Sequence, residues 1–281
     1  MAQSLNDSIS PLFTMPTSLD QIVAATRRRV AATQRTADVR ELERRAERHV
    51  PRGFRQHLQT SSDQGIAIIA ELKKASPSRG LIRADFNPSA LAKELADAGA
   101  AALSVLTDEE YFQGSLENLR LASESTSLPC LRKDFILDEF QILEARANRA
   151  DAILLIVAAL NEMELISLTR RARELSLDVL CEAHDEEELQ QALDAGCNLV
   201  GVNSRDLQTF KVNLNTALTL ADRIPKSVVS VAESGIHAAG DIANLRAAGY
   251  HAFLIGESLM KAGSPGEALA GLLGGSKVSH F

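Results

Sequence analysis

Short apolar runs alternate with helix-like segments eight times along this chain of 281 residues. A repeated strand-then-helix order predicts a parallel sheet with helices packed on it. The runs are apolar on both faces, as in strands buried between helices and a barrel interior, so we predict a closed (β/α)8 TIM barrel in preference to an open doubly wound sheet. The expected strands are 66–71, 101–106, 129–133, 152–157, 178–182, 199–203, 228–233 and 252–256.

Helical patterns follow every run, and one long pattern precedes them all. The first is amphipathic and covers residues 18–49, with a break near Thr36. We expect residues 1–281 to form a single barrel domain, on which residues 1–60 pack as an N-terminal helical extension. The helices after the strands are expected at 88–98, 115–125, 138–148, 161–175, 185–194, 214–222, 238–247 and 264–273.

The composition and net charge of the chain limit which partners and which cell compartment we expect. With 45% hydrophobic and 24% charged residues, the chain has the composition of a globular protein. The longest uncharged apolar stretch, 152–160, is too short to span a bilayer, and residues 1–18 lack the pattern of a signal peptide, so we predict a cytoplasmic protein without membrane partners. The net charge of −7 argues against nucleic acid as the main partner.

The cysteines are three, an odd number, and none forms a CxxC pair. This pattern argues against a disulfide framework and against a zinc site. We therefore expect Cys130, Cys181 and Cys197 to be reduced and buried.

Polar residues gather where the predicted strands end. Glu71 and Lys73 lie two residues apart, so they leave the first strand on the same face, and the loop after them carries Ser76 among other hydrogen-bond donors. In a (β/α)8 barrel the active site forms at the carboxyl ends of the strands. The convergence of so many acids and bases predicts a catalytic ring. Its members are Glu71, Lys73, Lys133, Glu182, Asn203, Arg205 and Glu233.

Two turns indicate an anion site. Ser234 and Gly235 follow the seventh strand, and Gly256 and Glu257 follow the eighth. Small residues with free backbone N–H groups at these places are typical of a phosphate site. The carboxylate of Glu257 is compatible with a phosphate only if it points outward.

Seven segments at or near the strand ends form a specific pattern. They are Glu71-Leu-Lys-Lys-Ala-Ser-Pro-Ser, Leu106-Thr-Asp-Glu-Glu-Tyr-Phe-Gln-Gly-Ser, Leu131-Arg-Lys-Asp-Phe, Glu182-Ala-His-Asp, Gly201-Val-Asn-Ser-Arg-Asp-Leu, Val231-Ala-Glu-Ser-Gly-Ile and Leu254-Ile-Gly-Glu-Ser-Leu-Met. Together and in this order they resemble the motifs of the indole-3-glycerol-phosphate synthase family, and the resemblance covers about residues 20–262.

The resemblance implies a reaction and no cofactor. The substrate would be 1-(2-carboxyphenylamino)-1-deoxyribulose 5-phosphate, and the products indole-3-glycerol phosphate, CO2 and water, a carboxy-lyase reaction of tryptophan biosynthesis. Lys133 matches the family's general acid. We expect nearby Arg132 and Lys73, with apolar walls, to lower its pKa.

The other residues can be matched to the same chemistry. Glu182 is the second acid or base, without a choice between removing the amine proton and protonating the departing hydroxyl. Glu71 and Glu233 would stabilise the cationic intermediate or orient the lysines, and Asn203 would bind the sugar hydroxyl. Lys73 and Arg205 suit the anthranilate carboxylate, which an apolar wall would desolvate. That wall is expected from Phe112, Phe135, Leu137 and Leu207.

Two other functions remain open from the sequence. One is a sister barrel acting on a related phosphorylated aminosugar, such as a phosphoribosylanthranilate isomerase, and the other is a noncatalytic phosphate-binding barrel. His184, followed by acidic residues, is expected to begin a helix rather than to bind a metal. We predict no metal, and we expect other tryptophan-pathway enzymes as candidate partners.

Overall fold

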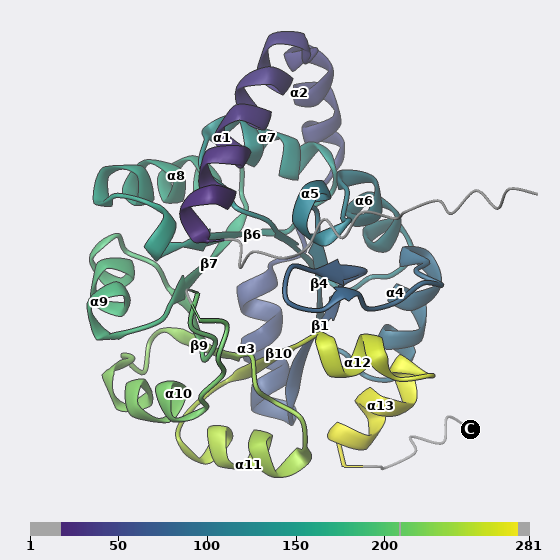
Figure 1. Ribbon diagram of the computed structural model, residues 1–281, viewed down its shortest axis with the longest axis vertical. Helices are drawn as coiled ribbons and strands as arrows, with labels where there is room; N and C mark the ends of the chain where they lie inside the picture. Colours follow the sequence, from purple (N-terminus) through teal and green to yellow (C-terminus); the bar gives the residue numbers. More distant parts are fainter. Residues whose placement is uncertain (1–17, 208, 275–281) are drawn as a thin grey trace, which may run out of the picture.

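Eight parallel strands close into a barrel, with helices outside it (Figure 1). The structure is a computed structural model that describes residues 18–207 and 209–274, so the expectations for residues 1–17 lie outside the described residues. Strand β1 pairs with β10 and with β4, which completes the ring. The predicted (β/α)8 fold is confirmed. The strands are β1 (Ala67–Leu72), β4 (Ala102–Leu106), β5 (Cys130–Lys133), β6 (Ala152–Ile156), β7 (Asp178–Ala183), β8 (Leu199–Asn203), β9 (Val229–Glu233) and β10 (Ala252–Ile255).

The two faces of each strand enter two different apolar clusters. Ile69, Leu131 and Leu180 belong to a cluster inside the barrel, whereas Ile68 and Cys130 belong to a larger one between the strands and the outer helices. Because side chains alternate along a strand, residues two positions beyond an interior residue also point inward. This alternation aims the last polar residue of several strands into the barrel mouth.

Short polar side chains begin most of the outer helices. Asn87, for example, accepts a hydrogen bond from the backbone of Ala90, and Asp185 accepts one from Glu188. None of the helices described has the length and apolar character needed to cross a membrane. The outer helices are α4 (Pro88–Asp97), α6 (Leu116–Glu124), α7 (Glu139–Ala147), α8 (Glu162–Glu174), α9 (Glu186–Asp194), α10 (Asn215–Leu220), α11 (Ala239–Ala247) and α13 (Pro265–Leu272).

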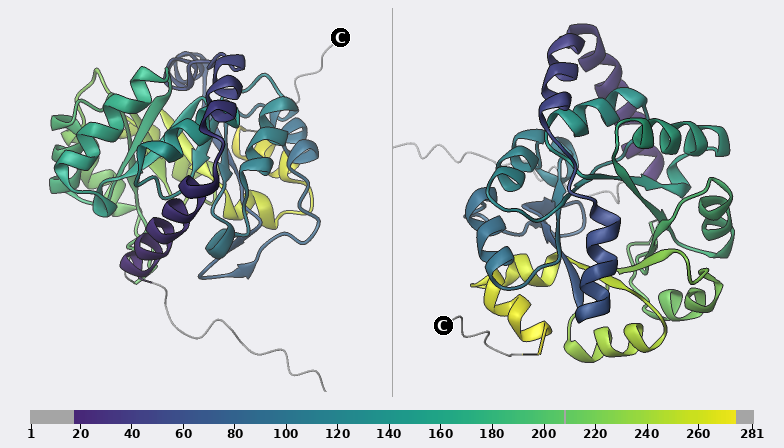
Figure 2. Two further views of the ribbon diagram at one scale, coloured as in Figure 1. Left: turned by 90° about the horizontal axis from the view of Figure 1, so that it is seen from above. Right: turned by 180° about the vertical axis from the view of Figure 1, so that it is seen from behind.

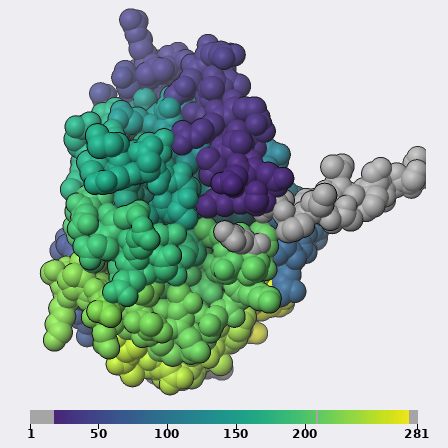
Figure 3. All heavy atoms as spheres, turned by 60° about the vertical axis from the view of Figure 1, so that its left-hand side comes forward, coloured from purple at the N-terminus to yellow at the C-terminus, as the bar shows by residue number. Residues whose placement is uncertain are grey.

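The N-terminal segment is two helices, α1 (Leu19–Thr36) and α2 (Val39–Arg48), with the predicted break after Thr36. The side chain of Asp38 caps α2 at this break. Helix α2 packs on α7 through Ala46, which joins Leu143 in a small apolar cluster. Figure 3 shows these helices in purple over the teal part of the chain. Helix α1 continues toward the barrel mouth, where the guanidinium of Arg29 lies 3.4 Å from Asp134.

Helix α3 (Phe54–Gln64) was not predicted as a separate helix, although its first part lies in the expected helical extension, and it closes the amino-terminal end of the barrel. Figure 2 (right) shows it across that end. Phe54 and Leu58 are fully buried and belong to the interior cluster. Only these two side chains carry the helical pattern, in a segment that is otherwise polar. Other short elements without a prediction are β2 (Ala75–Ser76), β3 (Gly80–Leu81), α5 (Glu109–Phe112) and α12 (Glu257–Lys261).

A buried ion cluster anchors the chain before α3 to the same end of the barrel. The guanidinium of Arg52 contacts both oxygens of Asp151, at 2.5 and 3.0 Å to Oδ2 and 3.1 Å to Oδ1. Nε2 of His49 lies 3.1 Å from Oδ1, and the backbone N–H of Cys130 donates to Oδ2 at 2.6 Å. Both carboxylate oxygens of Asp151 therefore have several donors.

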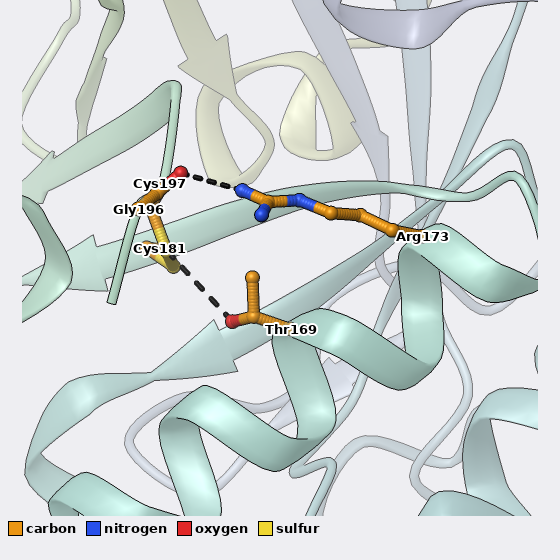
Figure 4. The surroundings of a disulfide bond; sticks show 5 residues. All are labelled: Thr169, Arg173, Cys181, Gly196 and Cys197. Carbon is orange, nitrogen blue, oxygen red and sulfur yellow. Dashed lines mark hydrogen bonds between the residues drawn. A yellow bond between two sulfur atoms is a disulfide. The ribbon is translucent and has the colours of Figure 1, made fainter.

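Cys181 and Cys197 form a disulfide, so the prediction of three reduced cysteines is wrong for these two (Figure 4). Cys181 points outward from β7, and Cys197 lies just before the neighbouring strand β8, so the barrel brings them together. Thr169 of α8 lies beside this pair, with its hydroxyl 3.9 Å from the sulfur of Cys197. Cys130 is free and buried, as expected. An odd cysteine count leaves one residue over but does not prevent the other two from pairing.

Candidate active site

A pocket of about 460 Å³ opens at the carboxyl ends of the strands. Every predicted polar residue and glycine lines it, as do Phe112, Phe135 and Leu207, and α1 contributes Leu19 and Ile22 from above the mouth. The sequence therefore identified which side chains meet, because strand alternation and barrel closure decide their meeting. The predicted residues in the lining are Glu71, Lys73, Ser76, Phe112, Lys133, Phe135, Glu182, Asn203, Arg205, Glu233, Ser234, Gly235, Gly256 and Glu257.

Lys133 is the centre of a buried ion network. Its Nζ lies 2.7 Å from Oε2 of Glu182 and 2.8 Å from Oε2 of Glu233. Burial alone would lower the pKa of Lys133, but the charges of Glu182, Glu233 and Glu71 outweigh burial and raise it. The expected lowering of this pKa is therefore wrong.

The reason is the direction of Arg132. Adjacent strand residues point to opposite faces, and the Arg132 side chain lies outside the barrel interior, where its guanidinium contacts Asp134 at 3.0 Å and Thr107 at 3.1 Å. Lys73 is occupied as well, because its Nζ lies 2.7 Å from Glu71. Lys133 thus faces carboxylates rather than cations.

Glu182 and Glu233 share this lysine but differ in pKa. Burial acts to raise both values. For Glu182, the charges of Lys133 and His184 outweigh burial, and its pKa lies well below the ordinary range. For Glu233, burial and the nearby charge of Glu182 outweigh Lys133, and its pKa rises to about 7. A pair of carboxylates with opposed shifts supplies one ionised group and one that holds a proton near neutral pH.

Asn203 links this network to the loop after β8. Its amide Nδ2 donates to Oε1 of Glu182 at 3.1 Å, and its Oδ1 accepts from the backbone N–H of Arg205 at 3.0 Å. The Arg205 guanidinium donates to the carbonyl of Phe210 at 3.2 Å and lies 3.7 Å from Glu257. The carboxyl-end charges thus form one connected surface along the pocket wall.

The turns after β9 and β10 form another part of the wall. Ser234 and Gly235 both have positive φ, at 65° and 80°, and a Cβ on Gly235 would lie 2.6 Å from Val212. The hydroxyls of Ser76 and Ser258 are buried in the lining without a hydrogen-bond partner in the described chain. Because these two hydroxyls line the pocket, they are available to bond water or a polar ligand there.

Glu257 does not face this wall as a free charge. Its carboxylate lies 2.6 Å from Lys261 and 3.1 Å from Arg79. Burial would raise its pKa, but the hydrogen bond and charge of Lys261, with Arg79, hold that pKa below the ordinary value. Glu257 lines the pocket rather than lying outside it, so its pairing with Lys261 and Arg79, and not an outward direction, offsets its charge beside a neighbouring anion.

The apolar wall differs in part from the prediction. Phe112 and Phe135 pack with ring centroids 6.5 Å apart, and Leu207 also lines the pocket. Leu137 is buried but does not line it, because the backbone turns after Phe135 and carries Leu137 away toward α7. The remaining apolar lining includes Leu154, Ile156, Phe210 and Leu254.

Two glycines make room for the carboxylates, and the sequence did not indicate this role. A Cβ on Gly201 would overlap Oε1 of Glu233. A Cβ on Gly256 would overlap Oε1 of Glu71 and lie 2.9 Å from its Cβ. The signal available in the sequence was Gly201 itself, an inward position two residues before Asn203 in a strand that otherwise carries large residues.

Comparison with known proteins decides the family. The family described as indole-3-glycerol phosphate synthase matches residues 19–272. The chain belongs to the indole-3-glycerol phosphate synthase family. An indole-3-glycerol phosphate synthase of Koribacter versatilis is 57% identical over 260 residues, which cover 92% of this chain and 100% of that relative. One of Desulfotalea psychrophila is 49% identical, with coverage of 90% and 97%.

A solved structure shows how widely the fold is shared beyond the indole-3-glycerol phosphate synthase family. Thiamine phosphate pyrophosphorylase from Pyrococcus furiosus superposes with a TM-score of 0.57 at 14% identity, over 75% of this chain and 95% of that one. At this identity the likeness concerns the fold alone.

Proposed function

We propose that this chain is an indole-3-glycerol-phosphate synthase that converts 1-(2-carboxyphenylamino)-1-deoxyribulose 5-phosphate into indole-3-glycerol phosphate, CO2 and water. The proposal rests on the contacts of Lys133 in a chain of this family. Inside the pocket, its Nζ lies 2.7 Å from the carboxylate of Glu182 and 2.8 Å from that of Glu233. The reaction needs a proton donor at a ketone oxygen and anions beside a cationic intermediate, and this network provides both.

Lys133 is the general acid of ring closure. The aromatic carbon that bears the carboxylate attacks the ketone carbon, and the electron pair of the C=O bond moves to its oxygen. The raised pKa of Lys133 keeps its ammonium protonated at neutral pH, and the ketone oxygen, which becomes more basic as it gains charge, can take that proton. Loss of CO2 then returns an electron pair to the ring.

The two glutamates divide the remaining proton transfers. Glu182, held ionised, is the base that takes a proton from the cationic intermediate. Glu233, with a pKa of about 7, holds a proton that it can give to the departing hydroxyl, which leaves as water. Glu71 is paired with Lys73 and adds negative charge beside the same intermediate.

Separate parts of the pocket bind the ends of the substrate. Lys73 and Arg205 bind the anthranilate carboxylate, and Asn203 binds a sugar hydroxyl. Phe112 and Phe135 form the apolar side that desolvates this carboxylate before CO2 leaves. The phosphate lies at the turns after β9 and β10, with Ser76 and Ser258 as hydroxyl donors, and the residues of those turns are Ser234, Gly235, Gly256 and Glu257.

No step of this scheme uses a metal or a cofactor. The proposal includes a cytoplasmic location, and it keeps the other tryptophan-pathway enzymes as candidate partners, since they make the substrate and consume the product.

The test is turnover of the carboxyphenylamino-deoxyribulose phosphate by the purified chain. The sequence contains no tryptophan and two tyrosines, so the indole product should appear as new fluorescence on a weak protein background. Phosphoribosylanthranilate serves as the competing substrate. A protein that produces no indole fluorescence, or that isomerises phosphoribosylanthranilate instead, would show the proposal to be wrong.

A further inference from the structure

His184 stands directly behind the proposed base and is not explained by the scheme above. It follows β7 two positions after Glu182, on the same face of the strand, and its side chain is only 13% exposed. Its Nε2 is buried, has no hydrogen-bond partner in the described residues, and lies 3.4 Å from Oε1 of Glu182. One edge of the imidazole thus faces the catalytic carboxylate.

The opposite edge is fixed by Glu188 of α9. Nδ1 of His184 lies 2.9 Å from Oε2 of Glu188, and the backbone N–H of His184 donates to the same oxygen at 2.8 Å. Glu188 holds the third position of α9, where a glutamate often reaches back to the N–H of the capping residue. Here it reaches one residue further, to His184, so it fixes the ring as well as the chain.

The three side chains therefore form a line of carboxylate, imidazole and carboxylate. The ionisable groups that act on His184 are Glu182 on β7 and Glu188 on α9. Burial would lower the pKa of His184, but these two carboxylates raise it to about 10, so the ring is a cation at neutral pH. The line does not form a metal site, because no group of three such side chains in residues 18–207 and 209–274 could hold a metal ion.

We propose that His184, oriented by Glu188, is a positioning residue that keeps the Glu182 carboxylate ionised and aimed at the substrate. This proposal rests on the proposed function, in which Glu182 is the base. Oε2 of Glu182 is held by Lys133, and Oε1 by Asn203 with His184 beside it. Without the His184 imidazolium, Glu182 would have one neighbouring cation, Lys133, instead of two. Among the described residues, its Oε1 would then accept a hydrogen bond only from the amide of Asn203.

The test compares His184→Gln and Glu188→Gln with His57→Gln, a matched control because His57 is an exposed residue of α3 far from the pocket. The first readout needs no substrate. It is the titration of the Glu182 carboxyl carbon by NMR, assigned with Glu182→Gln. Loss of the neighbouring cation should raise the pKa of Glu182 by about one unit or more in His184→Gln, with a smaller rise in Glu188→Gln. His57→Gln should match wild type.

The second readout is the pH profile of turnover. In His184→Gln we expect kcat to fall about tenfold with KM within about twofold, and the acidic limb of the kcat profile to move upward with the pKa of Glu182. An unchanged Glu182 titration in both variants would overturn the proposal, whatever the substrate proves to be. If the titration shifts but wild type makes no indole product, the positioning role stands and the proposed function fails. A shifted titration with a normal kcat profile would also overturn the proposal.

Discussion

The barrel holds a buried ion cluster at each end, and the two are built differently. At the amino end, both oxygens of Asp151 accept several hydrogen bonds, from Arg52, His49 and the backbone of Cys130. At the carboxyl end, Oε1 of Glu233 is buried and has no hydrogen-bond partner in the described chain, although Lys133 holds its other oxygen. The first cluster is saturated, and the second keeps unfilled positions beside a pocket.

The pKa values separate the clusters in the same way. Burial would raise the pKa of Asp151, but hydrogen bonds from His49 and Arg52 lower it below the ordinary value. The pKa of Glu233 rises to about 7, because burial and the charge of Glu182 outweigh Lys133. Removing one partner from a fully paired buried charge strongly destabilises the folded state, whereas buried charged groups with shifted pKa values beside a pocket are typical of functional sites.

The strongest test of the comparison is Asp151→Ala. It leaves Arg52 and His49 with buried polar groups and no carboxylate, so the free energy of unfolding should fall by about 3–5 kcal/mol. Below the unfolding temperature, kcat/KM should stay within about twofold of wild type. Urea denaturation and indole fluorescence measure the two quantities. Wild-type stability, or a loss of activity in a stably folded variant, would contradict a purely structural role.

The second test is Lys133→Met, which keeps most of the side-chain volume and removes the proton donor. We expect kcat to fall about a hundredfold or more, with a smaller change in KM. Lys93→Met, an exposed lysine of α4, is the control and should keep the wild-type kcat. A near-normal kcat in Lys133→Met would move the acid to Lys73.

The third test uses pH to compare the clusters. Because the folded state raises the pKa of Glu233 from 4.5 to about 7, it binds this proton more tightly than the unfolded state, and stability falls as pH rises through this window. Glu233→Gln cannot ionise, so between pH 5 and pH 8 it should gain on the order of 2 kcal/mol of stability relative to wild type. The contribution of Asp151 to stability changes with pH in the opposite direction. Because the folded state lowers its pKa, stability falls as the pH drops below 3.8. Urea midpoints of Glu233→Gln and wild type at pH 5 and pH 8 check the Glu233 prediction, and a constant difference between variant and wild type would refute it.

The smallest expected effect is that of Ser258→Ala. Loss of one hydrogen bond to the phosphate should raise KM about tenfold, with kcat within about twofold, since a hydrogen bond to a charged group contributes about 1.5 kcal/mol or more. Ser204→Ala is a matched control, because the Ser204 hydroxyl is also buried without a partner but does not line the pocket. Equal effects on KM from the two serines would remove Ser258 from the phosphate site.

Most of the fold was predictable, because each strand and outer helix carries its own signal. Every predicted strand boundary lies within one residue of the observed one. Helix α3 was missed since its pattern rests on Phe54 and Leu58 alone, which become buried only when the barrel supplies the surface beneath them. Helix α10 ends at Leu220, earlier than predicted, and a 3-10 turn over 221–223 takes the rest.

The charged residues of the site were predictable, but their electrostatics and part of the apolar lining were not. Strand alternation fixes that Lys133, Glu182 and Glu233 meet, but the pKa of a buried group depends on which neighbours point the same way. Arg132 is adjacent to Lys133 in sequence and on the opposite face in space. Strand alternation puts His184 on the same face as Glu182, but the orientation of its ring depends on Glu188 of α9, which the pattern of β7 does not indicate.

The two glycines beside the carboxylates limit how this protein can vary over evolutionary time. Even the smallest change at Gly256, to alanine, would push a methyl group against the Cβ of Glu71, which has no freedom to move within its strand. At Gly201 the same change would displace the tip of Glu233, which Lys133 holds in place. Selection that preserves Glu71 and Glu233 should therefore also preserve Gly256 and Gly201, although a glycine has no functional side chain. In a library of all single variants, these two codons should be as depleted of substitutions as those of the charged residues.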